Sequence, residues 1–482
     1  MYETKLLIGG KDAAATGGAT FDRKDPVTGE VATRAAAATV EDVNKVVEAA
    51  AAAFPVWSQM GPNQRRMILL KAADIMQSKA DEVGETITSE TGATLGWGGF
   101  NVMLASSMLR EAASMTTQIT GEVIPSDQGQ RLAMSVKQPC GVLVGIAPWN
   151  APIILGTRAV AMPLACGNSV ILKASELCPQ THRIIADCLK EAGVPDGAIS
   201  LITNAPADAP KIVEALISHP LVKRINFTGS TRVGKIIAEI AGRHLKPVLL
   251  ELGGKNPLIL LDDADVDDAV NSATFGAFMN QGQICMSTER IVVDETIADA
   301  FVEKFAAKAK SLPIGDPRSN VVLGALVDQA PVDKVNDLIK DAVEKGAKLV
   351  IGGHNDGAIM EATILDHVTP EMRIYSEESF GPVTTIVRGK GVDELIRIAN
   401  DTEYGLSSAV FGRDIARAIR VARRVESGIC HINGTTVDDE AQMPFGGVKG
   451  SGYGRFGGKM GIDQFTETRW ITIETDHHHY PF

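Results

Sequence analysis

The sequence predicts an α/β protein with two or three domains. The chain has 482 residues, and domains usually hold about 100 to 200 residues each. Hydrophobic residues make up 45% and charged residues 22%, which is ordinary for a folded globular protein and excludes a disordered or fibrous chain. Short apolar runs alternate with helical patterns through most of the sequence. That alternation is typical of parallel sheets covered by helices.

The first third of the chain is expected to begin with helices. Thr39 and Asp42 form a capping-box pattern ahead of a helix that reaches Phe54, and residues 63–83 repeat apolar side chains at helical spacing. From Gly141 onward, five apolar runs predict strands, separated by patterns at 181–193 and 232–244 that predict helices. The runs cover residues 142–148, 169–175, 199–203, 224–230 and 247–254. This arrangement indicates a doubly wound, Rossmann-like nucleotide-binding domain.

A second α/β region is expected over residues 262–433, with helices at 299–310 and 334–346 and strands at 290–295 and 383–389. Residues 119–139 carry a Pro-Ser-Asp turn between extended patterns and predict a projecting hairpin, and a strand is expected from Thr468. Exposed strand edges usually find a partner, so we expect a homodimer or homotetramer. The expected domains are 1–116 with 140–252, then 253–455, and a β element for oligomerisation formed by 117–139 and 466–482.

Composition excludes several classes of partner. The net charge is −12 and no basic block is present to neutralise a phosphate backbone, which argues against nucleic acid as a partner. The uncharged stretch 138–157 is interrupted by three prolines and does not predict a membrane span. Six cysteines are scattered without CxxC or His/Cys ligand spacing, which argues against disulfides and against a metal site. Reduced thiols of this kind indicate a cytoplasmic protein.

One cysteine has a setting that differs from the rest. Cys285 lies in FMNQGQICMSTER, a polar, glycine-bearing segment where backbone amides and solvent can reach a thiolate. The other five are expected to be small buried hydrophobic residues, and these are Cys140, Cys166, Cys178, Cys188 and Cys430. Cys285 is therefore the candidate nucleophile.

Glu251 and Asn150 are the candidates to assist it. Glu251 ends an apolar strand directly before two glycines, and burial there would raise its pKa toward the range useful for a general base. The alternative is a strand-end acid that pairs with a helix terminus or with Lys255. Asn150 follows Pro148 and Trp149 in a constrained turn, where its amide could donate to an oxygen that becomes negative. Alone, it would be an ordinary turn asparagine.

Two strand ends carry the residues expected to bind a nucleotide. Gly229 and Ser230 stand where a strand gives way to a helix, a natural seat for phosphate, although glycine at such a turn is common in α/β proteins. Lys173 and Glu176 follow another strand. A carboxylate at Glu176 can accept hydrogen bonds from ribose hydroxyls and would repel a 2′-phosphate, which favours NAD over NADP.

The ordered motifs together resemble those of the aldehyde dehydrogenase superfamily. They are PWN (148–150), KASE (173–176), FTGS (227–230), LELGGK (250–255), GQIC (282–285), EESFGP (377–382) and PFGGVKGSGYGR (444–455). The resemblance runs from about Leu6 to the end, and the spacing of Glu251 and Cys285 is similar to that of hydrolytic members. It implies an NAD-binding domain, an α/β catalytic domain and a small β oligomerisation element.

The resemblance also implies roles for single residues. Cys285 would be the nucleophile, Glu251 the general base, and Asn150 with the Cys285 amide the oxyanion hole. Lys173 and Glu176 would bind the adenosine ribose of NAD, and Glu378 the nicotinamide ribose. Ser230 would lie near the pyrophosphate and Phe380 beside the nicotinamide ring. Further cofactor contacts are implied for Gly229, Trp149 and Gly253.

Within the superfamily, long segments are most similar to bacterial dehydrogenases of vanillin and salicylaldehyde. Ala151 agrees with this likeness, because a small side chain after Asn150 leaves room for a ring. Trp97, Phe100, Arg158 and Phe445 are candidates for the pocket wall or entrance, and each could equally be a packed aromatic residue or a surface arginine.

The resulting hypothesis is NAD-dependent oxidation of an aromatic aldehyde, of the salicylaldehyde, vanillin or benzaldehyde type, to the acid through a thiohemiacetal and a thioester on Cys285. The enzymatic alternatives are a CoA-acylating or an aliphatic (semi)aldehyde dehydrogenase. Glu251 argues against CoA acylation, since that branch usually lacks a base there. A non-catalytic protein that keeps the fold, as some lens crystallins do, is the third alternative, and the intact Cys285, Glu251 and Asn150 argue against it.

Overall fold

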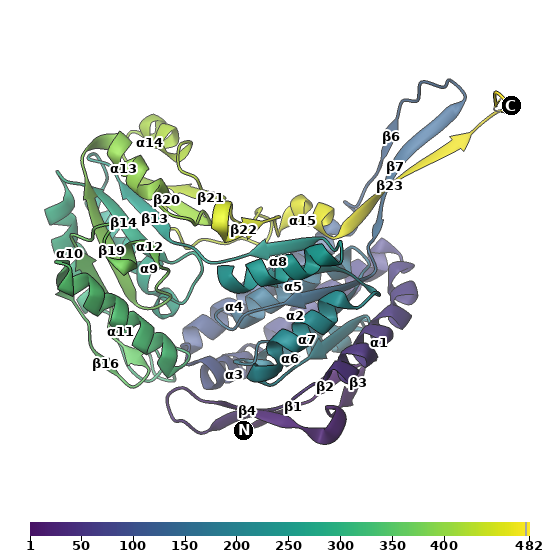
Figure 1. Cartoon of the computed structure of the whole chain (residues 1–482), viewed down its shortest axis with the longest axis horizontal. Helices are drawn as coiled ribbons and strands as arrows, with labels where there is room; N and C mark the ends of the chain where they lie inside the picture. Colours follow the sequence, from purple (N-terminus) through teal and green to yellow (C-terminus); the bar gives the residue numbers. More distant parts are fainter. Residues whose placement is uncertain (478–479) are drawn as a thin grey trace.

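The computed structural model describes residues 1–477 and 480–482, and its middle is an eight-stranded sheet (Figure 1). Five of its strands run parallel in the order β12-β11-β8-β9-β10, and they confirm the five predicted from the apolar runs. In sheet order the strands are β22 (Gly452–Tyr453), β12 (Val248–Glu251), β11 (Val222–Thr228), β8 (Val142–Ile146), β9 (Ser169–Lys173), β10 (Ile199–Ile202), β2 (Leu6–Ile8) and β3 (Lys11–Ala13).

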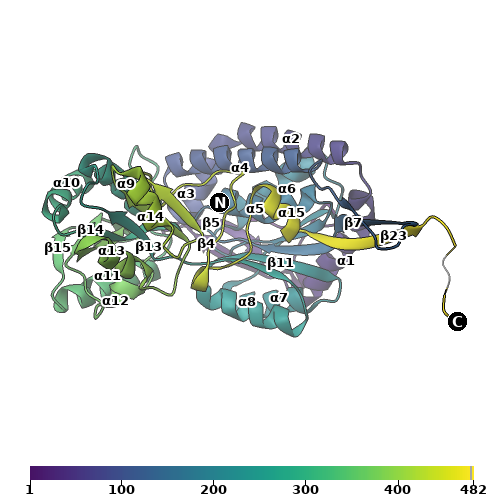
Figure 2. The ribbon, with the colours of Figure 1, turned by 90° about the horizontal axis from the view of Figure 1, so that it is seen from above.

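Helices cover both faces of this sheet (Figure 2). One face packs against α1 (Val40–Ser58), α7 (Ala209–Ser218) and α8 (Thr231–Arg243). The other packs against a layer made of α2 (Pro62–Ser78), α3 (Ala80–Thr91), α4 (Leu95–Met115), α5 (Pro152–Ala165) and α6 (Pro179–Ala192). The capping box of Thr39 and Asp42 is confirmed. The helical pattern over 63–83 is divided between two helices, α2 and α3, that meet at Lys79, and both pack on α4.

The prediction that the chain begins with helices is wrong. Before α1 the chain forms β1 (Tyr2–Thr4), β2, β3, β4 (Thr20–Lys24) and β5 (Val31–Ala36), of which β1, β5 and β4 make a separate small sheet. Three of these strands have only three residues each. Such short strands hold too few side chains to display an alternating pattern.

A seven-stranded sheet forms the second lobe and confirms the second α/β region (Figure 1). Its order is β15 (Lys348–Ile351), β18 (Thr363–Asp366), β19 (Val383–Gly389), β14 (Thr288–Asp294), β13 (Asn256–Leu260), β20 (Ser407–Phe411) and β21 (Ile429–Ile432). One face packs on α9 (Val266–Phe278) and α10 (Ala298–Lys310), and the other on α11 (Gln329–Glu344), α12 (Arg373–Ser376), α13 (Gly391–Asn400) and α14 (Ile415–Ala422). A short pair, β16 (Asn355–Asp356) and β17 (Ile359–Met360), lies beside it.

A three-stranded sheet projects from the body as an arm (Figures 1 and 2). The central strand is β7 (Arg131–Pro139), flanked by β6 (Glu122–Ile124) and by β23 (Thr466–Glu474), which follows α15 (Gly458–Gln464). The predicted hairpin and tail strand are confirmed. His478 and His479 of the expected 466–482 segment lie outside the described residues. Residues 452–453, expected in the second domain, pair with β12 of the first sheet.

A short connection leads from the first large sheet to the second. β12 ends at Glu251 and β13 begins at Asn256, so four residues carry the chain from the first sheet to the second. The carboxyl ends of β8, β9, β11 and β12 therefore face the amino ends of β13, β14 and β19. Ligands bind open parallel sheets at this carboxyl edge. Among the helices of the described residues, none is long and apolar enough to cross a membrane.

Candidate active site

Glu251 is a buried acid without a hydrogen-bond partner. Its side chain is only 1% exposed at the end of β12, and within the described part of the chain neither carboxylate oxygen has a partner at ordinary hydrogen-bond geometry. Burial raises the pKa of Glu251 to about 8, opposed by the Arg158 guanidinium and the nearby Cys285 thiol. A carboxyl group with this pKa exchanges its proton in the neutral range, as a general base must.

Lys255, the alternative partner for Glu251, is engaged elsewhere. Its ammonium group is fully buried and pairs at 2.7 Å with Glu289. The same Glu289 carboxylate accepts hydrogen bonds from the amides of Ser379 and Phe380 at 2.8 to 3.0 Å. The Glu289 carboxylate therefore fixes the segment around Phe380, whose φ of 54° is left-handed. Because Lys255 is paired with Glu289, it does not form the alternative ion pair with Glu251.

Cys285 lies in a tightly held loop between α9 and β14. The loop turns through left-handed conformations at Asn280 and Gln281, with φ of 49° and 55°. Asn256 donates to the carbonyl oxygens of Cys285 and Ser287 at 2.8 and 2.9 Å. Burial, and then the charge of Glu251, raises the pKa of the Cys285 thiol well above its usual value. At rest the thiol keeps its proton beside a group able to accept it.

Asn150 is held by three hydrogen bonds on the turn after β8. Its side-chain amide donates to the Gln283 carbonyl at 2.9 Å. Its backbone carbonyl accepts from the Trp97 indole at 2.9 Å and from the Asn280 amide at 3.0 Å. An amide nitrogen carries two hydrogens, so one donor of Asn150 remains for a ligand. Two of the partners that hold Asn150, Asn280 and Gln283, belong to the loop that carries Cys285.

Cys285, Glu251 and Asn150 all line one cavity of about 430 Å³. The predicted residues Trp149, Gly229, Ser230, Gly253, Glu378 and Phe380 line it as well. A neighbouring cavity of about 610 Å³ is lined by Lys173 and Glu176 and shares Pro148, Trp149, Thr228 and Gly229 with the first. The two cavities thus follow the carboxyl edge of the first sheet from Glu176 to Cys285.

The residues along this path have the chemistry that a dinucleotide needs. At one end Lys173 pairs with Glu176, which also accepts from Asn204 at 2.8 Å. In the middle, Ser230 caps the N-terminus of α8, a region that favours phosphate. At the far end Glu378 accepts from the Gly254 amide at 2.9 Å, and burial raises the pKa of Glu378 to about 7. A Cβ on Gly253 would lie 2.7 Å from that carboxylate, so the close approach requires glycine.

Comparison with known proteins identifies the family. The aldehyde dehydrogenase family model matches residues 13–471. The vanillin dehydrogenase of Pseudomonas fluorescens is 59% identical over 100% of both chains, and the salicylaldehyde dehydrogenase of Pseudomonas sp. strain C18 is 52% identical over 100% of both. The chain belongs to the aldehyde dehydrogenase family. The predicted family is therefore confirmed.

Solved structures of this family confirm the predicted fold. A salicylaldehyde dehydrogenase from Pseudomonas putida G7, in complex with salicylaldehyde, matches with a TM-score of 0.98 at 52% identity, over 100% of both chains. A betaine aldehyde dehydrogenase from Staphylococcus aureus, in complex with NAD⁺, matches with a TM-score of 0.94 at 31% identity, over 98% of this chain and 95% of that one.

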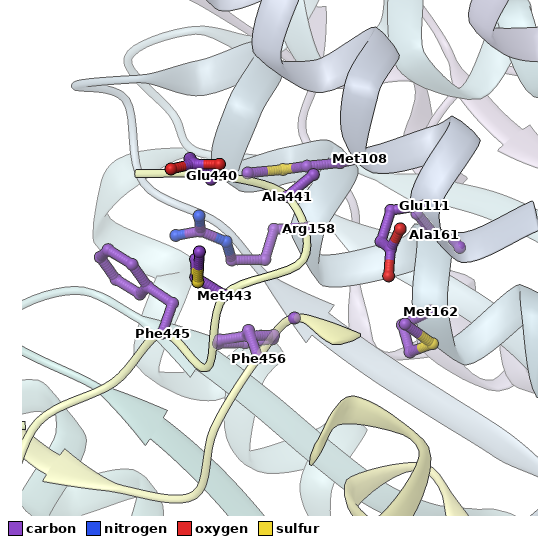
Figure 3. A pocket seen from close by; sticks show the side chains of 12 residues that line it. Met108, Glu111, Arg158, Ala161, Met162, Glu440, Ala441, Met443, Phe445 and Phe456 are labelled. Atoms are coloured by element: carbon purple, nitrogen blue, oxygen red, sulfur yellow. The ribbon is translucent and has the colours of Figure 1, made fainter. Parts of the chain in front are cut away.

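The residues predicted for the pocket wall lie in two places. Trp97 is buried behind Asn150 and stacks on Phe100 at 5.3 Å, while Ala151 is buried at the start of α5. Arg158 and Phe445 line a smaller cavity, where the guanidinium lies 4.1 Å from the ring centroid (Figure 3). Arg158 is not a surface arginine, because it is 7% exposed and forms a buried ion pair with Asp439.

Several residues of the site were not found from the sequence. Asp439, Glu289 and Asn280 give no local signal, since each acts through a partner more than 80 residues away in the chain. The expectation that Cys430 is buried is wrong, because β21 is the edge strand of its sheet and leaves Cys430 exposed. Over the described residues all six cysteines are unpaired, and no cluster of side chains suited to a metal is found.

The buried Glu251 predicts a pH-dependent stability. Its pKa is about 8 in the folded protein against an ordinary 4.5, so between these values the folded state binds more protons than the unfolded state. The free energy of unfolding contributed by Glu251 therefore falls as pH rises through this window. We expect Glu251→Gln to equal the wild type near pH 4.5 and to exceed it by on the order of a few kcal/mol at pH 8.

Melting temperatures at several pH values check this expectation. Glu239→Gln is the matched control, because it makes the same change at an exposed acid on α8. A Tm difference between Glu251→Gln and the wild type that stays constant from pH 5 to pH 8 would contradict a raised pKa at Glu251.

Proposed function

We propose that this aldehyde dehydrogenase oxidises an aromatic aldehyde to the carboxylic acid, with NAD as the hydride acceptor. The single observation that carries the proposal is the convergence of Cys285, the unpartnered Glu251 and the Asn150 amide on one cavity, which continues toward Glu176. A nucleophile, a base and an oxyanion donor within one site are the groups that acyl transfer requires.

Residues along the two cavities would hold the cofactor. Lys173 and Glu176 would bind the adenosine ribose, the α8 N-terminus at Gly229 and Ser230 the pyrophosphate, and Glu378 the nicotinamide ribose. Trp149 and Phe380, whose rings meet edge to face at 5.7 Å, would bound the nicotinamide. When bound, NAD supplies the oxidant that accepts hydride from the substrate.

In the first half of the reaction, the Cys285 sulfur bonds to the aldehyde carbon and the thiol proton passes to Glu251. The carbonyl oxygen becomes negative and is stabilised by the free amide hydrogen of Asn150 and the backbone amide of Cys285. Loss of hydride from this thiohemiacetal leaves a thioester on Cys285. The raised pKa of the thiol explains why the neighbouring base is needed.

In the second half, Glu251 releases its proton and then accepts one from water as the water attacks the thioester carbonyl. The carbon–sulfur bond breaks, the acid leaves, and Cys285 regains a proton. A base with a pKa of about 8 can both accept and release protons near neutral pH. One aldehyde, one NAD⁺ and one water thus give one acid, one NADH and one proton.

An aromatic substrate is supported by two kinds of observation. Relatives at 52 to 59% identity are named for vanillin and salicylaldehyde. In this chain, the small Ala151 follows Asn150, and aromatic side chains at Trp97 and Phe100 stack behind it. A small side chain next to Asn150 is compatible with a planar ring near the oxyanion donor.

Initial rates of NADH formation test the proposed function. The assay compares vanillin, salicylaldehyde, benzaldehyde and a short aliphatic aldehyde in kcat/KM, first with NAD and then with NADP. We expect the aromatic aldehydes with NAD to lead by at least about tenfold, or 1.4 kcal/mol in transition-state binding. Equal or better use of the aliphatic aldehyde would contradict the aromatic substrate, and activity only with CoA present would contradict hydrolysis.

We further propose that residues 1–116 with 140–252 bind the cofactor, that 253–455 carry the catalytic cysteine, and that 117–139 with 466–482 join subunits of a homodimer or homotetramer. The last point is supported by the arm, where β23 is an edge strand and Trp470 and Val123 are 72% and 73% exposed. Covering such an edge with a second copy removes it from water. The unpaired cysteines support a reduced, cytoplasmic setting.

Light scattering tests the subunit proposal. The wild type should have a mass of at least twice 51.1 kDa. Trp470→Asp should raise the subunit dissociation constant at least about tenfold, since a charge replaces apolar surface that the second subunit would bury. Leu245→Asp is the control, because Leu245 is 92% exposed on the body. A monomeric wild type, or equal effects of the two substitutions, would contradict a role for the arm.

A further inference from the structure

His182 is a fully buried histidine that the proposed chemistry does not use. It lies in the first turn of α6 and has no exposed surface. Its Nδ1 accepts a hydrogen bond from the Ser175 amide at 3.1 Å. Ser175 and its neighbour Glu176 line the larger cavity, so one side of the imidazole fixes the backbone of the segment that would bind the adenosine ribose.

The opposite edge of the ring faces the start of α5. A Cβ on Gly156 would lie 3.1 Å from Cδ2 and 3.4 Å from Nε2 of His182. The backbones of Pro148 and Pro152 favour the protonated ring and so oppose the lowering of the His182 pKa, which indicates that they lie near the imidazole. These two prolines flank Asn150, the oxyanion donor. The second edge of the ring therefore packs against the start of α5, the helix that follows the turn carrying Asn150.

The protonation state of His182 follows from its contacts. A nitrogen that accepts a hydrogen bond carries no proton, so Nδ1 is bare and the single proton is on Nε2, where it can be donated to a carbonyl oxygen. Burial lowers the pKa of His182 to about 3, so the ring stays neutral across the working range. The Cys178 sulfur, at 3.8 and 3.9 Å from the two nitrogens, packs against the ring.

The two segments that His182 joins follow adjacent parallel strands, β8 and β9. We propose that His182 is a positioning residue that holds the cofactor segment Lys173–Glu176 and the oxyanion turn Pro148–Pro152 in fixed register. This inference rests on the proposed function, because it assigns a cofactor to one segment and an oxyanion to the other. Loss of the ring should weaken both NAD binding and turnover.

Two substitutions separate the two contacts. His182→Phe keeps a ring but can neither accept from Ser175 nor donate to the prolines. His182→Asn places an amide oxygen near the position of Nδ1, where it can accept from Ser175, but it is too short to reach α5. Cys188→Ala is the matched control, since Cys188 is equally buried on α6 and contacts neither segment in the hydrogen-bond network.

The readouts are the Kd for NAD, from the rise in Tm with NAD concentration, and kcat with the best aldehyde. We expect His182→Phe to raise the Kd at least about fivefold, the effect of losing one hydrogen bond, and to lower kcat about tenfold or more. His182→Asn should restore the Kd to within about twofold of wild type while kcat stays low. Cys188→Ala should lower Tm alone.

The proposal is overturned if His182→Phe folds and keeps both constants within about twofold of wild type, or if it behaves as Cys188→Ala does. If His182→Asn does not restore NAD binding, the hydrogen bond from the Ser175 amide is not the cause of the weaker binding in His182→Phe. The wild type separates the two proposals: if NAD raises its Tm but no aldehyde is oxidised, the proposed function fails, whereas the effect of His182→Phe on the Kd still decides the contact to the cofactor segment.

Discussion

The burial of one unpaired carboxylate, Glu251, sets the requirements for the rest of the site. Two buried cations belong to the same junction, and of these the Arg158 guanidinium acts on Glu251 and opposes the rise of its pKa. Lys255 is matched by Glu289, and Arg158 is matched by Asp439. Because each cation already has its own acid, Glu251 remains without a partner and burial raises its pKa. Removing one partner of a buried pair is costly, so these pairs also hold the surrounding segments in place.

The topology explains why such an acid stands next to a cysteine. Glu251 is the last residue of β12, and only four residues later β13 begins in the other sheet. Asn256, the first residue of β13, uses its side chain to hold the loop of Cys285. The acid, the thiol and the segments proposed to bind the cofactor thus come from facing edges of two sheets, and neither sheet alone contains the site. Glu289 of β14 also accepts hydrogen bonds from the Ser379 and Phe380 amides, so it fixes a second segment at this junction between the sheets.

Much of the fold could be predicted because the parallel strands are long, apolar and separated by helical patterns. The strands before α1 were not predicted, and three of these five strands have only three residues, too few to show a period. The site divides in the same way. Cys285 and Glu251 stand out by their local settings, but only the resemblance to a family joined them. Asp439 lies 281 residues from Arg158 in the sequence. The left-handed backbone at Asn280 and Gln281 could not be predicted either, because neither residue is a glycine.

The central claim is that Glu251 activates water against an acyl group on Cys285. Rapid mixing of Glu251→Gln with vanillin and NAD, followed by peptide mass spectrometry, tests it most directly. The account predicts slowed formation of no more than about one NADH per subunit, because the thiol has lost the base that accepts its proton. It also predicts an acyl group retained on the Cys285 peptide, because no base activates water against the thioester. Steady turnover at the wild-type rate with no acyl group on Cys285 would contradict it.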